Sequence, residues 1–192
     1  MHEALRLYFL TFYVVGIVVL IIRVVFASVP LTKVEKQPQG VLRYLPVILI
    51  SVNWMLPPSA IFLRLGEIGA DWDALRVLGF LLSLYAAVML LWASNALGRF
   101  LVPRAVIFHD HTLVTSGPYH FVRHPIYSGV LALWLGTALA MLNLLLLLVW
   151  PAAMVGVSIQ ARLEEELLRA KFGPTYESYA QATSRLLPRF WS

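Results

Sequence analysis

Residues 116–129 read SGPYHFVRHPIYSG and interrupt an otherwise apolar chain with two histidines, an arginine and two tyrosines. Long apolar runs flank this stretch on both sides, so we expect it to lie where a membrane meets water. A second polar group, RLEEE at residues 162–166, follows the next apolar segments. We predict that the two polar stretches meet in space and form a cofactor site.

The composition is that of a membrane protein. The chain has 192 residues, of which 60% are hydrophobic and 13% charged, whereas soluble domains are about half apolar and a quarter charged. There are no cysteines, which excludes disulfides, thiolate metal sites and cysteine nucleophiles. The net charge of +5 comes from basic residues beside apolar runs, a pattern that indicates membrane topology and lipid contact rather than nucleic-acid binding.

The apolar runs predict an all-α, polytopic membrane protein with about five transmembrane helices. Pro57 and Pro58 are expected to kink or end the second helix, and Asp71 or Asp73 is expected to cap the third. The last two spans, joined at Asn143, are expected to form a short helical hairpin. The five spans are predicted at residues 7–29, 42–63, 74–97, 125–141 and 144–159.

We expect a single membrane domain over residues 1–192, divided into four parts. The first three spans (1–97) precede a cytosolic cofactor loop (98–125), the hairpin (126–159), and a cytosolic C-terminal helix and tail (160–192) with a break at Gly173-Pro174. With the N-terminus outside, only Arg6, Arg64 and Arg76 of the 15 basic residues lie on the outer side. This asymmetry predicts a cytoplasmic C-terminus and a cytoplasmic cofactor site.

The glutamates of the second polar stretch divide between two helix faces. At 100° per residue, Glu164 falls inside the apolar arc, whereas Glu165 and Glu166 fall on the opposite side, four residues from Arg169 and Arg162 respectively. A solvated, salt-bridged face therefore accounts for Glu166 but not for Glu164. A carboxylate that faces the interior near a membrane surface is a candidate functional group.

Arg123, His124 and Tyr127 surround the predicted start of a helix at Pro125. Free backbone N–H groups and the positive end of the helix dipole add to the charge of Arg123, which predicts an anion site. The alternative is a basic anchor with interfacial aromatic residues. No metal site is predicted, because His109 and His111 lack a nearby third ligand. Five glycines are expected to allow close helix packing: Gly79, Gly98, Gly129, Gly136 and Gly156.

Four motifs follow one another along the chain: LVTSGPY at 113–119, RHPIYSG at 123–129, EE at 164–165 and FGPTYESY at 172–179. Their combination resembles the isoprenylcysteine carboxyl methyltransferase family, whose core is similar to that of phospholipid N-methyltransferases. The resemblance extends from about residue 97 to 188 and is weak in the first two spans. The family pattern often has an arginine in place of His120.

The resemblance implies S-adenosylmethionine as methyl donor, bound in a cytosolic pocket over the last two spans. It further implies a lipophilic or lipidated substrate that enters sideways from the membrane lipids. Arg123 and Glu164 are the implied catalytic residues. The implied cofactor-binding residues are His111, Gly117, Pro118, Tyr119, Arg123, His124, Tyr127, Glu164 and Glu165.

Three functions remain open from the sequence. The first is methyl transfer to a carboxylate or thiol, as in isoprenylcysteine carboxyl methylation, and the second is N-methylation of a phospholipid head group. The third is a non-catalytic membrane protein that retains the fold. Neither a metal nor a nucleic acid is expected as a partner.

Overall fold

The computed structural model describes residues 2–26, 34–36, 44–101 and 107–188. Within this part of the chain the architecture is helical, as predicted. The elements are α1 (His2–Phe26), β1 (Val34–Lys36), α2 (Leu45–Phe62), α3 (Asp73–Leu97), η3 (Gly98–Phe100), β2 (Ile107–Phe108), η4 (Gly117–His120), α4 (Pro125–Ala140), α5 (Leu144–Phe172) and α6 (Pro174–Ala182). The predicted helices therefore lie where the apolar runs placed them, except that residues 27–29 and 42–43 of the first two predicted spans lie outside the described part of the chain.

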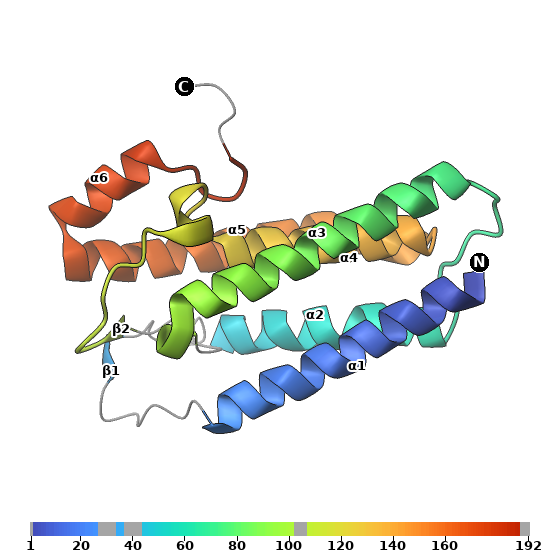
Figure 1. Ribbon diagram of the computed structural model, residues 1–192, viewed down its shortest axis with the longest axis horizontal. Helices are drawn as coiled ribbons and strands as arrows, with labels where there is room; N and C mark the ends of the chain where they lie inside the picture. The colour runs from blue at the N-terminus through green and yellow to red at the C-terminus, as the bar shows by residue number, and fades with distance from the viewer. Residues whose placement is uncertain (1, 27–33, 37–43, 102–106, 189–192) are drawn as a thin grey trace.

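The helices form two groups. In Figure 1, α1 and α2 run side by side along the lower half, whereas α3, α4 and α5 run across the upper half. The hairpin of α4 and α5 turns at Asn143, whose side chain accepts a hydrogen bond from the backbone of Leu146 at 3.0 Å and so caps α5. Arg6 of α1 binds Glu67 at 2.6 Å, which ties the first helix to the loop between α2 and α3.

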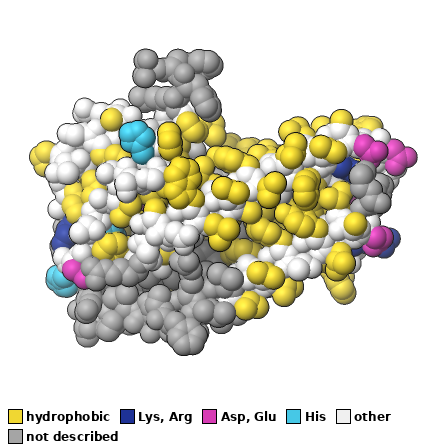
Figure 2. All heavy atoms as spheres, viewed as in Figure 1, with side chains coloured by type: hydrophobic (Ala, Val, Ile, Leu, Met, Phe, Trp, Pro, Cys, Tyr) yellow, Lys and Arg dark blue, Asp and Glu magenta, His cyan; other side chains and the backbone are white. Residues whose placement is uncertain are grey.

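Among the described residues, two helices are long and apolar enough to cross a membrane: Asp73–Leu97 and Leu144–Phe172. The helix between them, Pro125–Ala140, is apolar but shorter. Large apolar side chains, among them Leu78, Leu91 and Leu148, are more than half exposed, and such side chains cover much of the face in Figure 2. A surface of this kind is suited to lipid.

Helices α3 and α4 pack closely where glycines replace side chains. A Cβ atom added to Gly79 would lie 2.2 Å from the backbone nitrogen of Ala140 and 2.5 Å from the carbonyl of Gly136. A Cβ added to Gly136 would in turn lie 2.5 Å from Ser83 Oγ. Helix packing by Gly79, Gly129, Gly136 and Gly156 is confirmed, because each faces a neighbouring element within 3 Å of an added Cβ. The prediction for Gly98 is wrong: it ends α3 with φ 55° and has no such neighbour.

The predicted continuation of the second helix to residue 63 agrees with α2: Pro57 and Pro58 lie inside the helix and do not end it, since it continues to Phe62. Neither Asp71 nor Asp73 caps α3, because Trp72 occupies that position without a side-chain hydrogen bond. The pairing of β1 with β2, two antiparallel strands of three and two residues, has no periodic signal in the sequence.

Replacement of Gly79 by alanine should destabilise the protein. The added Cβ meets backbone atoms of α4 that cannot rotate away, so the helices must separate, at a cost of about 1–3 kcal/mol. Gly69→Ala is the matched control, because a Cβ there meets nothing within 4 Å. Thermal unfolding in detergent should give a lower midpoint for Gly79→Ala alone; equal midpoints would contradict the packing described.

Candidate functional site

The two polar stretches meet in space, as predicted. The hairpin places the residues just before α4 against the C-terminal half of α5. Arg123 Nε donates to Glu165 Oε1 at 3.0 Å, and His124 Nε2 lies 3.3 Å from the same oxygen. His124 Nδ1 lies 3.6 Å from Glu164 Oε2. His124 therefore stands between the two neighbouring carboxylates.

Glu165 is completely buried and collects four cationic or polar partners. Besides Arg123 and His124, Arg185 binds it through two hydrogen bonds of 3.0 and 2.8 Å, and Arg169 lies 3.6 Å away. The hydrogen bond to Glu165 raises the pKa of Arg185. The i,i+4 spacing to Arg169 is as predicted, but the side of α5 opposite the apolar arc is not open to solvent at Glu165. The segment after α6 folds over that face and supplies Arg185, which the helix projection does not include.

Arg123 also fixes the C-terminal segment. Its Nη1 donates to the carbonyl oxygens of Ala180, at 2.7 Å, and Thr183. Its backbone N–H donates to Ser184 O at 2.8 Å, and the next N–H, that of His124, donates to Arg185 O at 3.0 Å. These bonds hold the guanidinium in one place, with only 11% of the side chain exposed.

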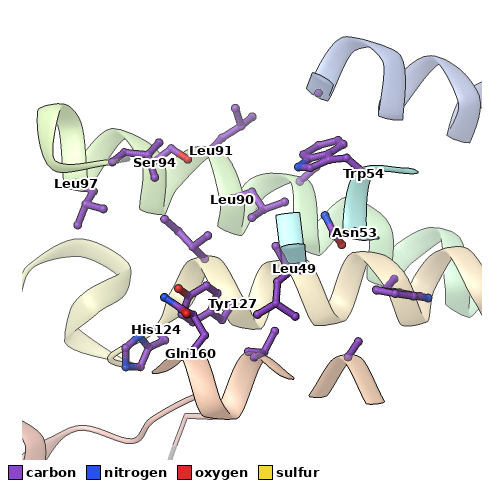
Figure 3. Close-up of a pocket in the computed structure, with 18 of the residues that line it drawn as sticks. Leu49, Asn53, Trp54, Leu90, Leu91, Ser94, Leu97, His124, Tyr127 and Gln160 are labelled. Atoms are coloured by element: carbon purple, nitrogen blue, oxygen red, sulfur yellow. The ribbon is translucent and has the colours of Figure 1, made fainter. Parts of the chain in front are cut away.

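Glu164 faces a cavity, in agreement with its predicted position on the apolar face, whereas Glu166 is exposed. Its side chain is 27% exposed. Glu164 Oε1 accepts hydrogen bonds from the hydroxyl of Tyr127 and from Gln160 Nε2, the latter at 2.9 Å. Figure 3 shows His124, Tyr127 and Gln160 gathered at one end of the cavity.

The charge of His124 depends on both glutamates. Burial by itself lowers the pKa of a histidine, but the hydrogen bonds to Glu164 and Glu165 outweigh burial here and raise the pKa of His124 above 6.5. The protonated ring has a donor for each carboxylate, so the cationic form satisfies both contacts at once.

The cavity has a volume of about 1140 Å³ and extends from this polar end between the helices. Its remaining wall is mostly apolar and comes largely from α1, α2, α3, α4 and α5. Six of the predicted site residues line it: His111, Tyr119, Arg123, His124, Tyr127 and Glu164. Gly117, Pro118 and Glu165 do not. Gly117 and Pro118 form η4, which presents Tyr119, and Gly117 has a φ of 61° that favours glycine.

Sequence reasoning missed several residues of the site. Gln160 lines the cavity one helical turn before Glu164, so the same projection that selected Glu164 also pointed to it. Tyr179 lines the cavity from α6 and donates to Tyr119 O at 2.6 Å. Arg185 lies in a segment without helical periodicity, and no signal in the sequence pointed to its contact with Glu165.

Comparisons with known proteins agree with this arrangement. Residues 74–175 match the family model described as phospholipid methyltransferase. A probable protein-S-isoprenylcysteine O-methyltransferase of Oryza sativa subsp. japonica is 38% identical over 80 residues, which are 41% of this chain and 42% of that protein. The corresponding enzyme of Schizosaccharomyces pombe is 35% identical over 80 residues, 41% of this chain and 34% of that protein.

Two further proteins are similar. The cobalt-zinc-cadmium resistance protein CzcN of Cupriavidus metallidurans is 36% identical over 88 residues, 42% of this chain and 37% of that protein. The solved structure of the eukaryotic intramembrane Ras methyltransferase ICMT has a TM-score of 0.55 and 22% identity, and the match covers 79% of this chain and 54% of that one. The chain thus spans about two-fifths or less of the curated relatives that it matches.

The helical fold, the apolar helices and the intramembrane neighbour define a helical membrane protein with the fold of that methyltransferase. The chain belongs to the phospholipid methyltransferase family, whose model matches more than half of it. The resemblance to isoprenylcysteine carboxyl methyltransferases is confirmed by the same comparisons.

Loss of the charge on Glu165 should unfold the site. Glu165→Gln leaves Arg123 and Arg185 without their common anion, a change that costs about 3–5 kcal/mol for buried pairs; since Arg185 is 34% exposed, we expect the lower end of this range. Glu166→Gln, one residue along and exposed, should stay within about 0.5 kcal/mol of the wild type. Unfolding midpoints in detergent compare the two; similar values would show that Glu165 is not the centre of the network.

Stability should fall as pH rises above the ordinary pKa of histidine. Because the pKa of His124 is raised in the folded protein, its contribution is complete below about pH 6.5 and is lost as pH rises through the folded value. The unfolding midpoint of the wild type should therefore decrease over this window. The unfolding midpoint of His124→Gln should change less with pH than that of the wild type. Parallel changes in the two proteins would show that protonation of His124 does not stabilise the fold.

Proposed function

We propose that the protein is a membrane-embedded methyltransferase that moves a methyl group from S-adenosylmethionine to a lipophilic acceptor, with a carboxylate or thiol as the favoured acceptor group. The observation that carries this proposal is the two-part cavity. One end presents a partly exposed carboxylate beside a histidine and an arginine, and the rest is an apolar chamber. A charged donor and a lipophilic acceptor need these two environments in one continuous space.

The residues at the polar end fit the chemical groups of S-adenosylmethionine. Gln160 Oε1 is buried and has no hydrogen-bond partner in the described part of the chain. Together with the carboxylate of Glu164 it offers acceptors for an ammonium group. Arg123 and His124 supply positive charge for the carboxylate of the same molecule. When bound, the cofactor would supply a methyl group activated on a sulfonium.

The other predicted residues either line the cavity or support the residues that do. Tyr119 and Tyr127 line the cavity with aromatic side chains, which favour a nearby cation, and His111 borders the same space. Glu165 stands behind the site and orients Arg123 and His124. Gly117 and Pro118 hold Tyr119 in place through η4. Arg123 and Glu164 remain the proposed catalytic residues, since both reach the cavity wall.

The chain contributes alignment and exclusion of water rather than covalent chemistry. Holding donor and acceptor in line converts a bimolecular reaction into an effectively unimolecular one. Apolar walls from α2, α3 and α5 keep water away from the reacting groups. An anionic acceptor requires no proton removal before the methyl group is transferred, so no base is needed for the favoured reaction.

For the membrane topology we propose five spans, with the N-terminus outside and the C-terminus and cofactor site cytoplasmic. α1 has 25 residues and α2 has 18, which at 1.5 Å per residue correspond to about 38 and 27 Å. Together with α3, α4 and α5 they account for the five apolar runs. The distribution of basic residues supports the orientation.

A second candidate is N-methylation of a phospholipid head group, which the description of the matched family model favours. An ammonium acceptor has to lose a proton before it can attack, and His124 or Glu164 is the base within the cavity. The two functions differ in the acceptor atom, so the methylated product separates them.

Methyl-labelled S-adenosylmethionine supplied to membranes that contain the protein tests the proposal. We expect label in a lipophilic ester or thioether. Label in a phospholipid head group would select the second candidate. If the protein does not bind S-adenosylmethionine in nanodiscs, the result would support the third function, a non-catalytic membrane protein that retains the fold.

Glu164→Gln should weaken cofactor binding by at least about tenfold, because a charged hydrogen-bond partner contributes about 1.5–3 kcal/mol. Glu166→Gln is the matched control, since that side chain is exposed and away from the cavity. Isothermal titration in nanodiscs measures both. Equal affinities in the two variants would remove Glu164 from the cofactor site.

A further inference from the structure

Arg185 binds both oxygens of the buried Glu165 carboxylate, although it does not itself line the cavity. Its Nε donates to Glu165 Oε1 at 3.0 Å, and its Nη2 donates to Glu165 Oε2 at 2.8 Å. Two such bonds, one to each oxygen, make the bidentate pair that an arginine forms with a carboxylate. A pair of this kind fixes the position of the carboxylate and also the plane in which its two oxygens lie.

The orientation of this carboxylate determines what the ring of His124 contacts. Glu165 Oε1, the oxygen that accepts from Arg185 Nε, lies 3.3 Å from His124 Nε2. The same oxygen accepts from Arg123 Nε at 3.0 Å. A rotation of the carboxylate that lengthens these contacts would also break the bidentate pair. Through Glu165, Arg185 therefore restrains two side chains that reach the cavity.

A second connection joins Arg185 to the same histidine through the main chain. The carbonyl oxygen of Arg185 accepts from the backbone N–H of His124 at 3.0 Å. Beside it, the carbonyl oxygen of Ser184 accepts from the backbone N–H of Arg123 at 2.8 Å. Arg185 thus holds the backbone of His124 directly and its ring through Glu165.

Arg169 approaches the same carboxylate with a different geometry. Its Nη2 lies 3.6 Å from Glu165 Oε2, which is longer than a normal hydrogen bond, and 40% of its side chain is exposed. Its Nε donates instead to Glu177 Oε1 at 3.0 Å. Arg169 therefore contributes positive charge near Glu165 but does not set the orientation of the carboxylate.

We propose that Arg185 is a positioning residue of the site: its bidentate bond to Glu165 holds the ring of His124 in the orientation in which it faces the cavity. The inference rests on the proposed function and adds to it a residue that does not touch substrate, cofactor or the reacting atoms. Lysine does not replace this arginine, because an ammonium group lacks the fixed fork that binds both carboxylate oxygens. Charge alone is therefore insufficient at position 185, whereas it is sufficient at position 169.

Exchange of the ring N–H protons of His124 with water tests the orientation in the whole protein without cofactor. A buried ring N–H that is bonded to a fixed acceptor exchanges slowly, because the site must open first. Nuclear magnetic resonance of nitrogen-15-labelled histidine in detergent measures the exchange at about pH 6, below the ordinary pKa of histidine. The signal of His124 is assigned by its loss in His124→Gln.

In this measurement Arg185→Lys should exchange about tenfold faster than the wild type, since a hydrogen bond to a charged group contributes about 1.5–3 kcal/mol. Arg169→Lys is the matched control: it changes the other arginine beside the same carboxylate and keeps its charge. It should exchange like the wild type. Unfolding midpoints in detergent establish that both variants are folded.

Cofactor affinity is the second measurement, because a misplaced His124 no longer supplies its charge where the cofactor binds. Arg185→Lys should bind S-adenosylmethionine about tenfold more weakly than the wild type, whereas Arg169→Lys should bind it equally well. Isothermal titration in nanodiscs compares the two. Arg185→Gln retains both tests if Arg185→Lys does not fold, since its amide donates at most to one oxygen at a time and should give the same losses.

Wild-type exchange and affinity in a folded Arg185→Lys would overturn the proposal, because charge alone would then be sufficient. Equal losses in the two lysine variants would overturn it as well, since only one of the two arginines is bidentate. Faster exchange in Arg185→Lys with unchanged cofactor affinity would remove its positioning role. If the wild type binds no cofactor, the proposed function fails, and the exchange rates still decide whether Arg185 orients His124.

Discussion

The structure of the site depends on the burial of one carboxylate. Glu165 has no exposed surface, and a buried charge is tolerated only with compensating partners. Those partners come from three places: Arg123 before α4, Arg169 on α5 itself, and Arg185 after α6. Their convergence fixes the hairpin against the C-terminal segment and makes that segment a wall of the site. Backbone hydrogen bonds from residues 123 and 124 to the same segment extend this connection.

Two neighbouring glutamates take opposite roles because a helix turns 100° between them. Glu165 points into the arginines and holds the scaffold, whereas Glu164 points into the cavity and remains partly exposed. His124 contacts both. A change in the charge of either carboxylate therefore acts on the protonation of this histidine, and so the electrostatics of the cavity wall are coupled to those of the scaffold. This coupling explains why the positively charged form of His124 is favoured despite its burial.

The sequence predicts most of the helical framework, because apolar runs, helix periodicity and Gly-Pro breaks are local signals. The meeting of the two polar stretches and the inward position of Glu164 also follow from such signals. The burial of Glu165 does not, since a helix projection contains no information about a later segment that folds over it. Proline alone leaves a kink or an end open at Pro57 and Pro58, and the continuous apolar run to residue 63 correctly indicates that α2 continues through both. The features that local patterns do not predict depend on tertiary contacts between residues that are distant in the sequence.

The polar end and the apolar wall of the cavity come largely from different parts of the chain. The family match begins at residue 74 and so includes α3, α4 and most of the polar end, but it excludes α1 and α2. Those two helices supply much of the apolar wall, with Asn53 among its residues. The proposed methyl transfer depends on the polar end, which lies mostly within the family match, whereas the proposed choice of acceptor depends on the wall opposite. Differences in acceptor within the family are therefore expected to arise in α1 and α2, which the family match does not cover.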